Sequence, residues 1–334
     1  MMAMRGFTGI GLGGAIVAAV ALTVEYAPER SRAMLVTLMF VGFPLGGSLG
    51  GLLATPLMSA FGWQGVFVFG GLMPLVLIAA VSRYLPESLQ FRVAAGTDPA
   101  QIGSIVQQID PSYRYQPGDR FVSGEPRAGS SRIAELFIAA RLPGTLLLWL
   151  ICFANLLVLY LLISWLPSIL HEAGLSQARA NLGAVTFNLG GVFGGLALSF
   201  AVDRLGAFRV LAAGYALTAV VVFAIARTQS MGLAMALAAF AGAGIIGSQF
   251  CISALASAFY PTAVRSTGVG WALGVGRMGA ILGPLVGGLA LASGATMAVI
   301  FSAAALPVLL CSAAVMLLSV AYRRAAAQAA TVPD

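Results

Sequence analysis

Apolar stretches of about twenty residues follow one another along almost the whole chain, with short polar turns between them. A stretch of that length crosses the hydrocarbon core of a bilayer as an α-helix. Of the 334 residues, 60% are hydrophobic and only 9% are charged, which is too few to enclose this apolar surface in a water-soluble globule. The alternating ten-residue pattern of a membrane β-barrel is absent. The sequence therefore predicts an all-α, multi-pass protein of the inner (plasma) membrane.

Hydropathy predicts about nine transmembrane helices. We expect them near residues 5–26, 33–58, 64–84, 142–168, 180–201, 208–226, 231–258, 267–292 and 296–321. Residues 87–140 form the only long polar segment, with several prolines and a short helix expected near 100–108. The predicted organisation is an incomplete N-terminal bundle at 1–86, a central loop at 87–140 and a complete six-helix bundle at 141–334.

The basic residues predict how the chain is oriented. All 18 are arginines, and fourteen of them fall in the turns on one side of the predicted bundle. By the positive-inside rule that side is cytoplasmic, which also places the C-terminus and the 87–140 loop in the cytoplasm. The arginines form no patch with aromatic residues, so we expect no nucleic-acid partner. The expected surroundings are the lipid bilayer, and the expected state is a monomer.

Two glycine-rich stretches repeat each other. Residues 42–51 and 279–288 both read GxxxG[G/P]xxGG, and the second lies six predicted helices after the first. This spacing indicates two six-helix halves, of which the first lacks three helices, so we expect a chain equivalent to helices 4–12 of twelve. Small residues four apart let helices approach closely. The glycine-rich faces of the second, fifth and eighth predicted helices are therefore expected either to slide between two rocking halves or to pack statically.

Nothing in the sequence indicates an enzyme. The three cysteines, Cys152, Cys251 and Cys311, lie in apolar helices, and His171 is the only histidine. No metal-binding spacing, nucleophile motif or cofactor loop is present. We expect no cofactor, no metal and no catalytic residue.

Charged residues inside the apolar helices are the first candidate site residues. Arg277 lies midway along a predicted helix, where a cation costs about 2.5 to 3.5 kcal/mol on insertion scales and so has to face protein, water or a counter-ion. Arg277 and Arg5 are candidates for binding an anionic substrate or compensating a carboxylate, although Arg5 also suits a terminal snorkelling side chain. Glu25, at the end of the first helix, is the proton-coupling candidate, with interfacial pairing to Arg30 or Arg32 as the alternative.

Two further groups of polar residues are candidates. Asp203 and Arg204, with Arg209 nearby, lie in a cytoplasmic turn and are expected to form a gate, or else an ordinary helix cap. Amide and aromatic side chains within the predicted helices are expected either to line a binding cavity or to hydrogen-bond between helices. These are Asn155, Tyr160, Trp165, Asn188 and Gln249.

Several motifs in the chain resemble those of the major facilitator superfamily, and more narrowly its aromatic acid:proton symporters. The matching stretches are RGFTGIGLGG at 5–14, EYAPER at 25–30, FGW at 61–63, LPES at 85–88 and YPTAVRSTGVGW at 260–271. The resemblance implies that Arg5 and Glu25 are the charged pair of helix four. It likewise makes Asp203 and Arg204 the second copy of the cytoplasmic loop signature, and Arg277 the arginine of helix eleven.

This resemblance implies proton-coupled uptake of a small aromatic carboxylate by alternating access, with a small organic anion and a proton as partners. The helix-one acidic motif of the family has no counterpart in the chain, so a truncated, non-transporting membrane remnant is an alternative. Transport of a sugar or of another organic anion is a further alternative, because the same scaffold serves many substrates.

Overall fold

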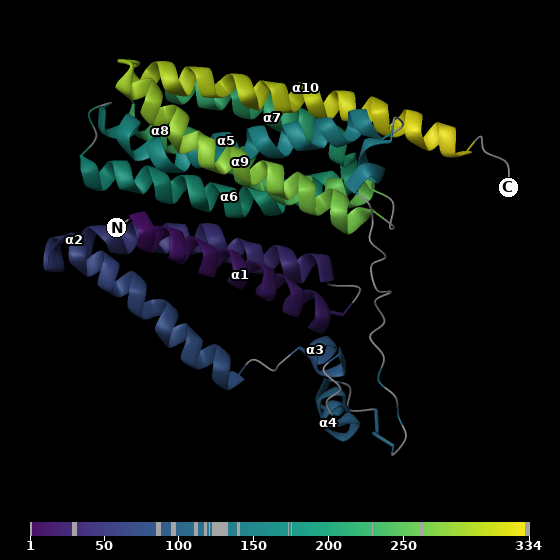
Figure 1. The fold of residues 1–334 in the computed structure, drawn as a ribbon. Coiled ribbons are helices and arrows are strands. Elements are labelled where there is room, and N and C mark those ends of the chain that lie inside the picture. Colours follow the sequence, from purple (N-terminus) through teal and green to yellow (C-terminus); the bar gives the residue numbers. More distant parts are fainter. Residues whose placement is uncertain are drawn as a thin grey trace. The chain divides into compact units, whose positions relative to one another are not determined.

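The structure is a computed structural model that describes residues 2–28, 32–84, 88–94, 98–109, 113–116, 119, 121, 133–138, 141–172, 174, 176–228, 230–260 and 264–330. Within these ranges the chain forms helices and no strand (Figure 1). They are α1 (Met2–Tyr26), α2 (Arg32–Tyr84), α3 (Leu89–Ala94), α4 (Pro99–Ile109), the 3-10 helix η2 (Ile133–Phe137), α5 (Leu142–Glu172), α6 (Gln177–Leu205), α7 (Ala207–Ile225), α8 (Met231–Phe259), α9 (Arg265–Ala292) and α10 (Met297–Ala330). The predicted all-α fold is confirmed.

Helix α2 contains two of the predicted membrane crossings. Its apolar part, Leu38–Arg83, has 46 residues, and at 1.5 Å per residue the helical rise of its two arms adds up to about 69 Å, more than twice the ~30 Å hydrocarbon core. Gly62 interrupts the helix with φ 67° and ψ −173°, in the left-handed range of φ that favours glycine. The break falls between the predicted helices at 33–58 and 64–84. Seven described helices are long and apolar enough to cross a membrane, and α1 adds a shorter apolar run, Gly6–Ile16.

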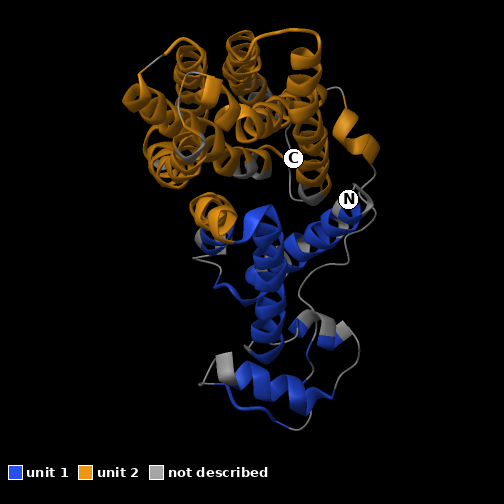
Figure 2. Cartoon of the chain, turned by 90° about the vertical axis from the view of Figure 1, so that its left-hand side faces the viewer, with its two compact units in different colours: residues 1–41, 61–130 blue, residues 42–60, 131–334 orange. Residues whose placement is uncertain are grey.

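The contacts divide the chain into two compact units (Figure 2). Unit 1 comprises Met1–Val41 and Phe61–Ser130, and unit 2 comprises Gly42–Ala60 and Ser131–Asp334. In unit 2 the principal helix pairs are α6 with α8, α5 with α9, and α7 with α10. Large apolar side chains also cover the outside of these helices, as expected where lipid is the solvent: Phe193 is 68% exposed and Leu306 is 62% exposed.

Glycines set the close helix contacts of unit 2. A Cβ atom at Gly190 of α6 would lie 2.0 Å from the carbonyl oxygen of Ala239 in α8, and one at Gly279 of α9 would lie 2.1 Å from the carbonyl oxygen of Phe153 in α5. Only glycine permits this approach of backbone to backbone. These glycines of α6 and α9 therefore pack tightly inside unit 2, as the static alternative expects, whereas nothing lies within 4 Å of a Cβ atom at Gly270 or Gly274 of α9. Sliding of the glycine-rich faces stays a prediction.

The central loop contributes short ordered pieces to unit 1. Helix α4 confirms the helix expected near 100–108. Tyr115 packs on Gly103 of this helix, since a Cβ there would lie 2.6 Å from the tyrosine ring. The hydroxyl of Tyr113 donates a 2.5 Å hydrogen bond to the carboxylate of Asp119, which also accepts from the backbone N–H of Gln116. This bond raises the pKa of Tyr113 to about 12 and lowers the pKa of Asp119.

Candidate substrate-binding site

A chain of three polar side chains crosses the interior of unit 2. The hydroxyl of Tyr215 on α7 donates to Oδ1 of Asn155 on α5 at 3.0 Å, and Nδ2 of Asn155 donates to Oε1 of Gln249 on α8 at 2.7 Å. Tyr215 is 0% exposed and Asn155 is 1% exposed, whereas Gln249 is only partly buried. The structure therefore brings two predicted site residues together, and Gln249 is the accessible end of the chain.

The hydrogen-bonded chain lies about midway along each helix that carries it. Asn155 is the fourteenth of 31 residues in α5, and Tyr215 is the ninth of 19 in α7. The side chains of Asn155 and Tyr215 are buried at this depth and have no water to bond with. An unpaired buried amide would cost several kcal/mol, so their hydrogen bonds stabilise them inside the apolar bundle. Tyr215 was not anticipated, because a lone tyrosine in an apolar helix gives no signal of its partner.

Arg277 lies at the same level of unit 2 as Asn155. Its neighbour Gly276 packs on Leu156 and Cys152 of α5, which adjoin Asn155 along that helix. The Arg277 side chain is exposed, and among the described residues it has no ion-pair or hydrogen-bond partner. An arginine this far inside an apolar helix requires water or an anion to compensate its charge. Arg277 is therefore a cation near the middle of α9 whose charge no described residue compensates.

The two aromatic candidates on α5, Tyr160 and Trp165, are not part of the hydrogen-bonded chain that contains Asn155. Tyr160 is five residues further along, which places it about 140° around the helix, and it is half-buried. The indole Nε1 of Trp165 donates to the carbonyl oxygen of Pro284 on α9 at 3.2 Å, and its ring packs on Gly287. Trp165 thus joins α5 to α9, while Tyr160 stays available on another face of α5.

Asn188 bonds within its own helix. Its Nδ2 donates to the carbonyl oxygen of Ala184 at 2.9 Å, and the side chain is half-buried. A Cβ at Gly47 of α2 would lie 3.2 Å from Oδ1 of Asn188, and one at Gly51 would lie 3.0 Å from Val185. Asn188 therefore lies where the Gly42–Ala60 part of α2 approaches α6 within unit 2.

The turn between α6 and α7 holds the predicted gate. Gly206, at φ 88°, separates the two helices, and its N–H bonds to the carbonyl oxygen of Val202. The guanidinium of Arg204 lies 4.1 Å from the centroid of the Phe200 ring, a cation–π contact, and Arg209 is exposed on the first turn of α7. The side chain of Asp203 lies outside the described residues, so its predicted pairing stays a prediction.

Glu25 is bonded to the segment that follows α2. The hydroxyl of Ser88, just before α3, donates to Oε2 of Glu25 at 2.7 Å within unit 1. Ser88 belongs to the LPES stretch, although sequence reasoning did not connect it with Glu25. Arg5 lies in the first turns of α1, and its side chain is outside the described residues.

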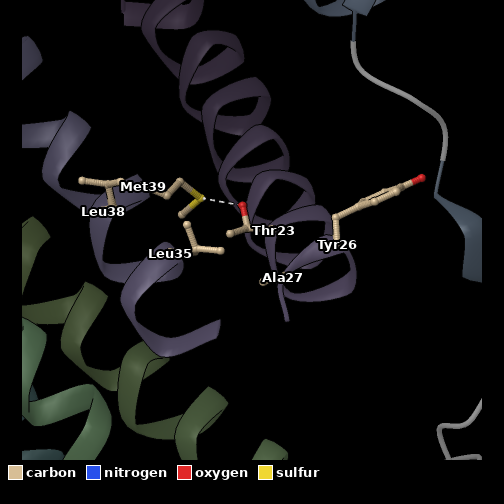
Figure 3. A pocket seen from close by; sticks show the side chains of 6 residues that line it. All are labelled: Thr23, Tyr26, Ala27, Leu35, Leu38 and Met39. Carbon is tan, nitrogen blue, oxygen red and sulfur yellow. Dashed lines mark hydrogen bonds between the residues drawn. The ribbon is translucent and has the colours of Figure 1, made fainter. Parts of the chain in front are cut away.

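An apolar cavity of about 400 Å³ lies beside Glu25, between the end of α1 and the start of α2 in unit 1 (Figure 3). It is lined by Thr23, Tyr26, Ala27, Leu35, Leu38 and Met39. The Thr23 hydroxyl lies 3.5 Å from the sulfur of Met39 and donates to the carbonyl oxygen of Ala19 at 2.7 Å. The lining carries no charged group, which is why no sequence signal pointed to it.

No group of three or more His, Cys, Asp or Glu side chains that could hold a metal ion occurs in the part of the chain that the structure describes. The fold and the site define a multi-pass helical membrane protein with a cation and amides at mid-depth. The Major Facilitator Superfamily pattern matches residues 1–181 and, in a second match, residues 148–333. The chain belongs to the Major Facilitator Superfamily.

The chain is similar to transporters of aromatic acids. It is 37% identical over 315 residues to the gallate transporter of Pseudomonas putida, covering 94% of this chain and 70% of the relative. It is 38% identical over 321 residues to the 4-hydroxybenzoate transporter PcaK of Pseudomonas aeruginosa, covering 95% and 71%. With the benzoate transport protein of Acinetobacter baylyi it shares 34% identity over 286 residues, covering 85% and 61%. The expected family, and a transporter in place of an enzyme, are confirmed.

The fold is similar to that of a solved transporter. An inward-facing, occupied bacterial homologue of the human lysosomal transporter Spinster superposes with a TM-score of 0.52 at 18% sequence identity, covering 94% of this chain and 73% of the other. At this identity the likeness concerns the fold alone, and the substrate has to be argued from the site.

Proposed function

We propose that the protein is a secondary transporter that moves a small aromatic carboxylate across the plasma membrane together with a proton, by alternating access. The observation that carries this proposal is Arg277, an exposed guanidinium without an ion-pair partner among the described residues, at the level of Asn155. An anionic substrate supplies the missing charge, and a guanidinium can hold a carboxylate bidentately. The names of the relatives support an aromatic acid as that anion.

Glu25 is the proposed proton carrier. Its carboxylate accepts the hydrogen bond of Ser88, and an ionised carboxylate is a stronger acceptor than a carboxylic acid. Protonation of Glu25 therefore weakens the link between the end of α1 and the segment before α3. By the arginine distribution this end of α1 is cytoplasmic, where a substrate-coupled proton would be released. Asp203, Arg204 and Arg209 form the proposed cytoplasmic gate, and the C-terminus is cytoplasmic.

Replacement of Arg277 tests the proposal. The protein, expressed in a bacterium that does not take up aromatic acids, is assayed with radiolabelled 4-hydroxybenzoate and with gallate and benzoate as competitors. Arg277→Gln removes the charge, and we expect the KM for uptake to rise at least tenfold because a charge-assisted hydrogen bond is lost. Arg277→Lys keeps the positive charge but lacks the guanidinium that can bind a carboxylate bidentately, so we expect a smaller rise in the KM for uptake.

The matched control is Arg227→Gln. Arg227 follows α7, is exposed and stacks on the Phe223 ring at 4.8 Å. The Arg227→Gln substitution therefore removes one arginine of unit 2 without changing the proposed site. We expect uptake by this variant to match the unmodified protein. Equal uptake by the Arg277→Gln variant and the unmodified protein would show that Arg277 does not bind the substrate. Uptake of sugars and not of aromatic acids would show that the substrate class is wrong.

A further inference from the structure

We propose that the groove between the end of α7 and the start of α10 binds an anionic phospholipid, whose phosphate is held by Arg227 and whose acyl chains follow the apolar outer side of unit 2. The groove shares no residue with the proposed substrate site, so this inference does not depend on the proposed function. It goes beyond that function by giving one class of lipid a fixed place on the protein.

The α7–α10 groove is a cavity of about 510 Å³ in unit 2. It is lined by Arg227, Ala298, Val299, Ser302 and Ala303. Its volume falls within the roughly 300 to 1,000 Å³ that is usual for ligand sites. Helices α7 and α10 form one of the principal pairs of unit 2 and lie side by side (Figure 1). One cation, one hydroxyl and three apolar side chains therefore meet at one end of this pair.

Arg227 supplies a positive charge that no described residue compensates. Its guanidinium contacts the ring of Phe223, one helical turn earlier, and has no ion-pair or hydrogen-bond partner among the described residues. A contact with a ring face leaves the guanidinium N–H groups available, and these can bind a phosphate bidentately. Ser302, the sixth residue of α10, adds a hydroxyl that can donate to the same anion. The polar part of the groove therefore favours an anion.

The position of Arg227 along α7 favours a lipid phosphate over a dissolved anion. Helix α7 has 19 residues and is about 28 Å long at 1.5 Å per residue, close to the ~30 Å hydrocarbon core. Arg227 follows its last residue, Ile225, by two positions and so lies at the level of the lipid headgroups. Helix α10 begins at the same end of the pair, with Met297. A cation at this depth attracts the anionic headgroups that the bilayer itself holds there.

The groove continues toward the middle of the membrane as an apolar surface. On α7, Phe223 and Val220 lie four and seven positions before Arg227, on the same helical face, and both are exposed. On α10, Val299 and Leu306 lie two turns apart and are also exposed. Acyl chains are the solvent of such a surface in a membrane. A molecule with a phosphate at the headgroup level and hydrocarbon chains beneath it matches both parts of the groove.

The single charge of the lining distinguishes between phospholipids. Phosphatidylglycerol has a net negative charge, whereas phosphatidylcholine carries a quaternary ammonium beside the same phosphate. That ammonium meets no carboxylate among the residues that line the groove, and Arg227 repels it. We therefore expect phosphatidylglycerol to bind more tightly than phosphatidylcholine.

The test is a lipid titration of the purified, delipidated full chain in detergent, followed by native mass spectrometry and by the midpoint of thermal unfolding. We expect saturable binding of phosphatidylglycerol that raises this midpoint, and weaker binding of phosphatidylcholine. Arg227→Gln should raise the Kd for phosphatidylglycerol about tenfold, because charge-assisted hydrogen bonds are lost. Arg227→Lys keeps the charge without bidentate binding and should raise the Kd less.

Two further variants separate the groove from the general charge of the surface. Arg179→Gln removes an exposed arginine of α6 that does not line the groove, and we expect its Kd for phosphatidylglycerol to match that of the unmodified protein. Ala303→Phe keeps every charge but fills the apolar part of the groove. We expect it to raise the Kd about threefold, because the acyl chains lose apolar contact.

Several outcomes would overturn the inference. An unchanged Kd in the Arg227→Gln variant, or an equal rise in the Arg179→Gln variant, would show that binding does not involve the groove. An unchanged Kd in the Ala303→Phe variant would show that acyl chains do not enter it, and equal affinity for phosphatidylcholine would show that the net charge of the lipid is not recognised. Displacement of phosphatidylglycerol by inorganic phosphate or by 4-hydroxybenzoate would assign the groove to a dissolved anion. None of these measurements uses uptake, so they stand whether or not the proposed function does.

Discussion

Alanine substitution in the two glycine-rich repeats should have opposite effects on stability. Gly283 of α9 and Gly46 of α2 occupy the same place in the repeat. At Gly283 a Cβ would lie 2.3 Å from the carbonyl oxygen of Leu157 and 3.0 Å from the N–H nitrogen of Leu161. At Gly46 nothing lies within 4 Å of such an atom. The same one-carbon change therefore meets backbone in one repeat and open space in the other.

The magnitudes follow from these distances. Ordinary van der Waals contact begins at 3.4 Å, so α5 and α9 have to separate locally by about 1 Å to accommodate Gly283→Ala. Overpacking of this kind costs about 1 to 3 kcal/mol, and the better helix propensity of alanine offsets up to about 1 kcal/mol. We expect a net loss of about 1 to 2 kcal/mol for Gly283→Ala. At Gly46 the added carbon meets no other atom, so only the better helix propensity of alanine acts, and Gly46→Ala should raise the free energy of unfolding by up to about 1 kcal/mol.

Tryptophan fluorescence provides the assay. Three of the four tryptophans lie at the contact of α5 with α9: Trp149 stacks on Trp271 at 5.8 Å, and Trp165 packs on Gly287. Unfolding of the purified protein in detergent, followed by this fluorescence during an SDS titration, reports the separation of the two helices. A loss of stability for Gly46→Ala as large as that for Gly283→Ala, or a gain for Gly283→Ala, would refute the argument from backbone contact.

Three further predictions concern local interactions. Gly62→Ala should destabilise the protein by about 1 to 2 kcal/mol in the same SDS titration, because alanine is strained at a φ of 67°. Trp165→Phe should cost about 1 kcal/mol there by leaving the carbonyl oxygen of Pro284 without its 3.2 Å donor. Absorbance at 295 nm should show Tyr113 titrating near pH 12, and near its ordinary pKa of 10.0 in an Asp119→Asn variant.

The pH range of the loop contact follows from the two pKa shifts. The raised pKa of Tyr113 keeps its hydroxyl protonated until the pH approaches 12. The lowered pKa of Asp119 means that its contribution is present above the ordinary value of 3.8 and is lost as the pH falls through the lower value. The contact should persist between these limits. If Asp119→Asn left the titration of Tyr113 unchanged, this account of the loop contact would be wrong. If Gly62→Ala or Trp165→Phe unfolded in the SDS titration like the unmodified protein, the corresponding prediction of lost stability would be wrong.

Much of the fold could be predicted because lipid imposes a simple rule on the chain. Every crossing has to satisfy its own backbone and be apolar for about twenty residues, so hydropathy marks the crossings directly. The break at Gly62 within α2 falls between two predicted helices, so the two arms of α2 correspond to the two predicted crossings. The division into 1–86, 87–140 and 141–334 stays a prediction. The contacts instead group Gly42–Ala60 with the six-helix unit.

The site was harder to predict because its members meet only through packing. Asn155 and Gln249 were both expected, yet their 2.7 Å hydrogen bond joins residues 94 positions apart. Tyr215 was missed for the same reason. The glycine-rich repeat likewise predicted that helices approach closely at these glycines, but it did not show which helix each glycine-rich face contacts. Only the structure shows that Gly283 packs on α5, while the equivalent Gly46 has open space around it.

The most direct test of the central claim is proton movement driven by the substrate. The purified protein is placed in proteoliposomes with a pH-sensitive dye inside, and 4-hydroxybenzoate is added outside without any imposed gradient. We expect the interior to acidify when the acid enters, in a manner that depends on the protein and is greatly reduced by Arg277→Gln. Protein-dependent entry of labelled 4-hydroxybenzoate without any change of internal pH would contradict proton-coupled transport.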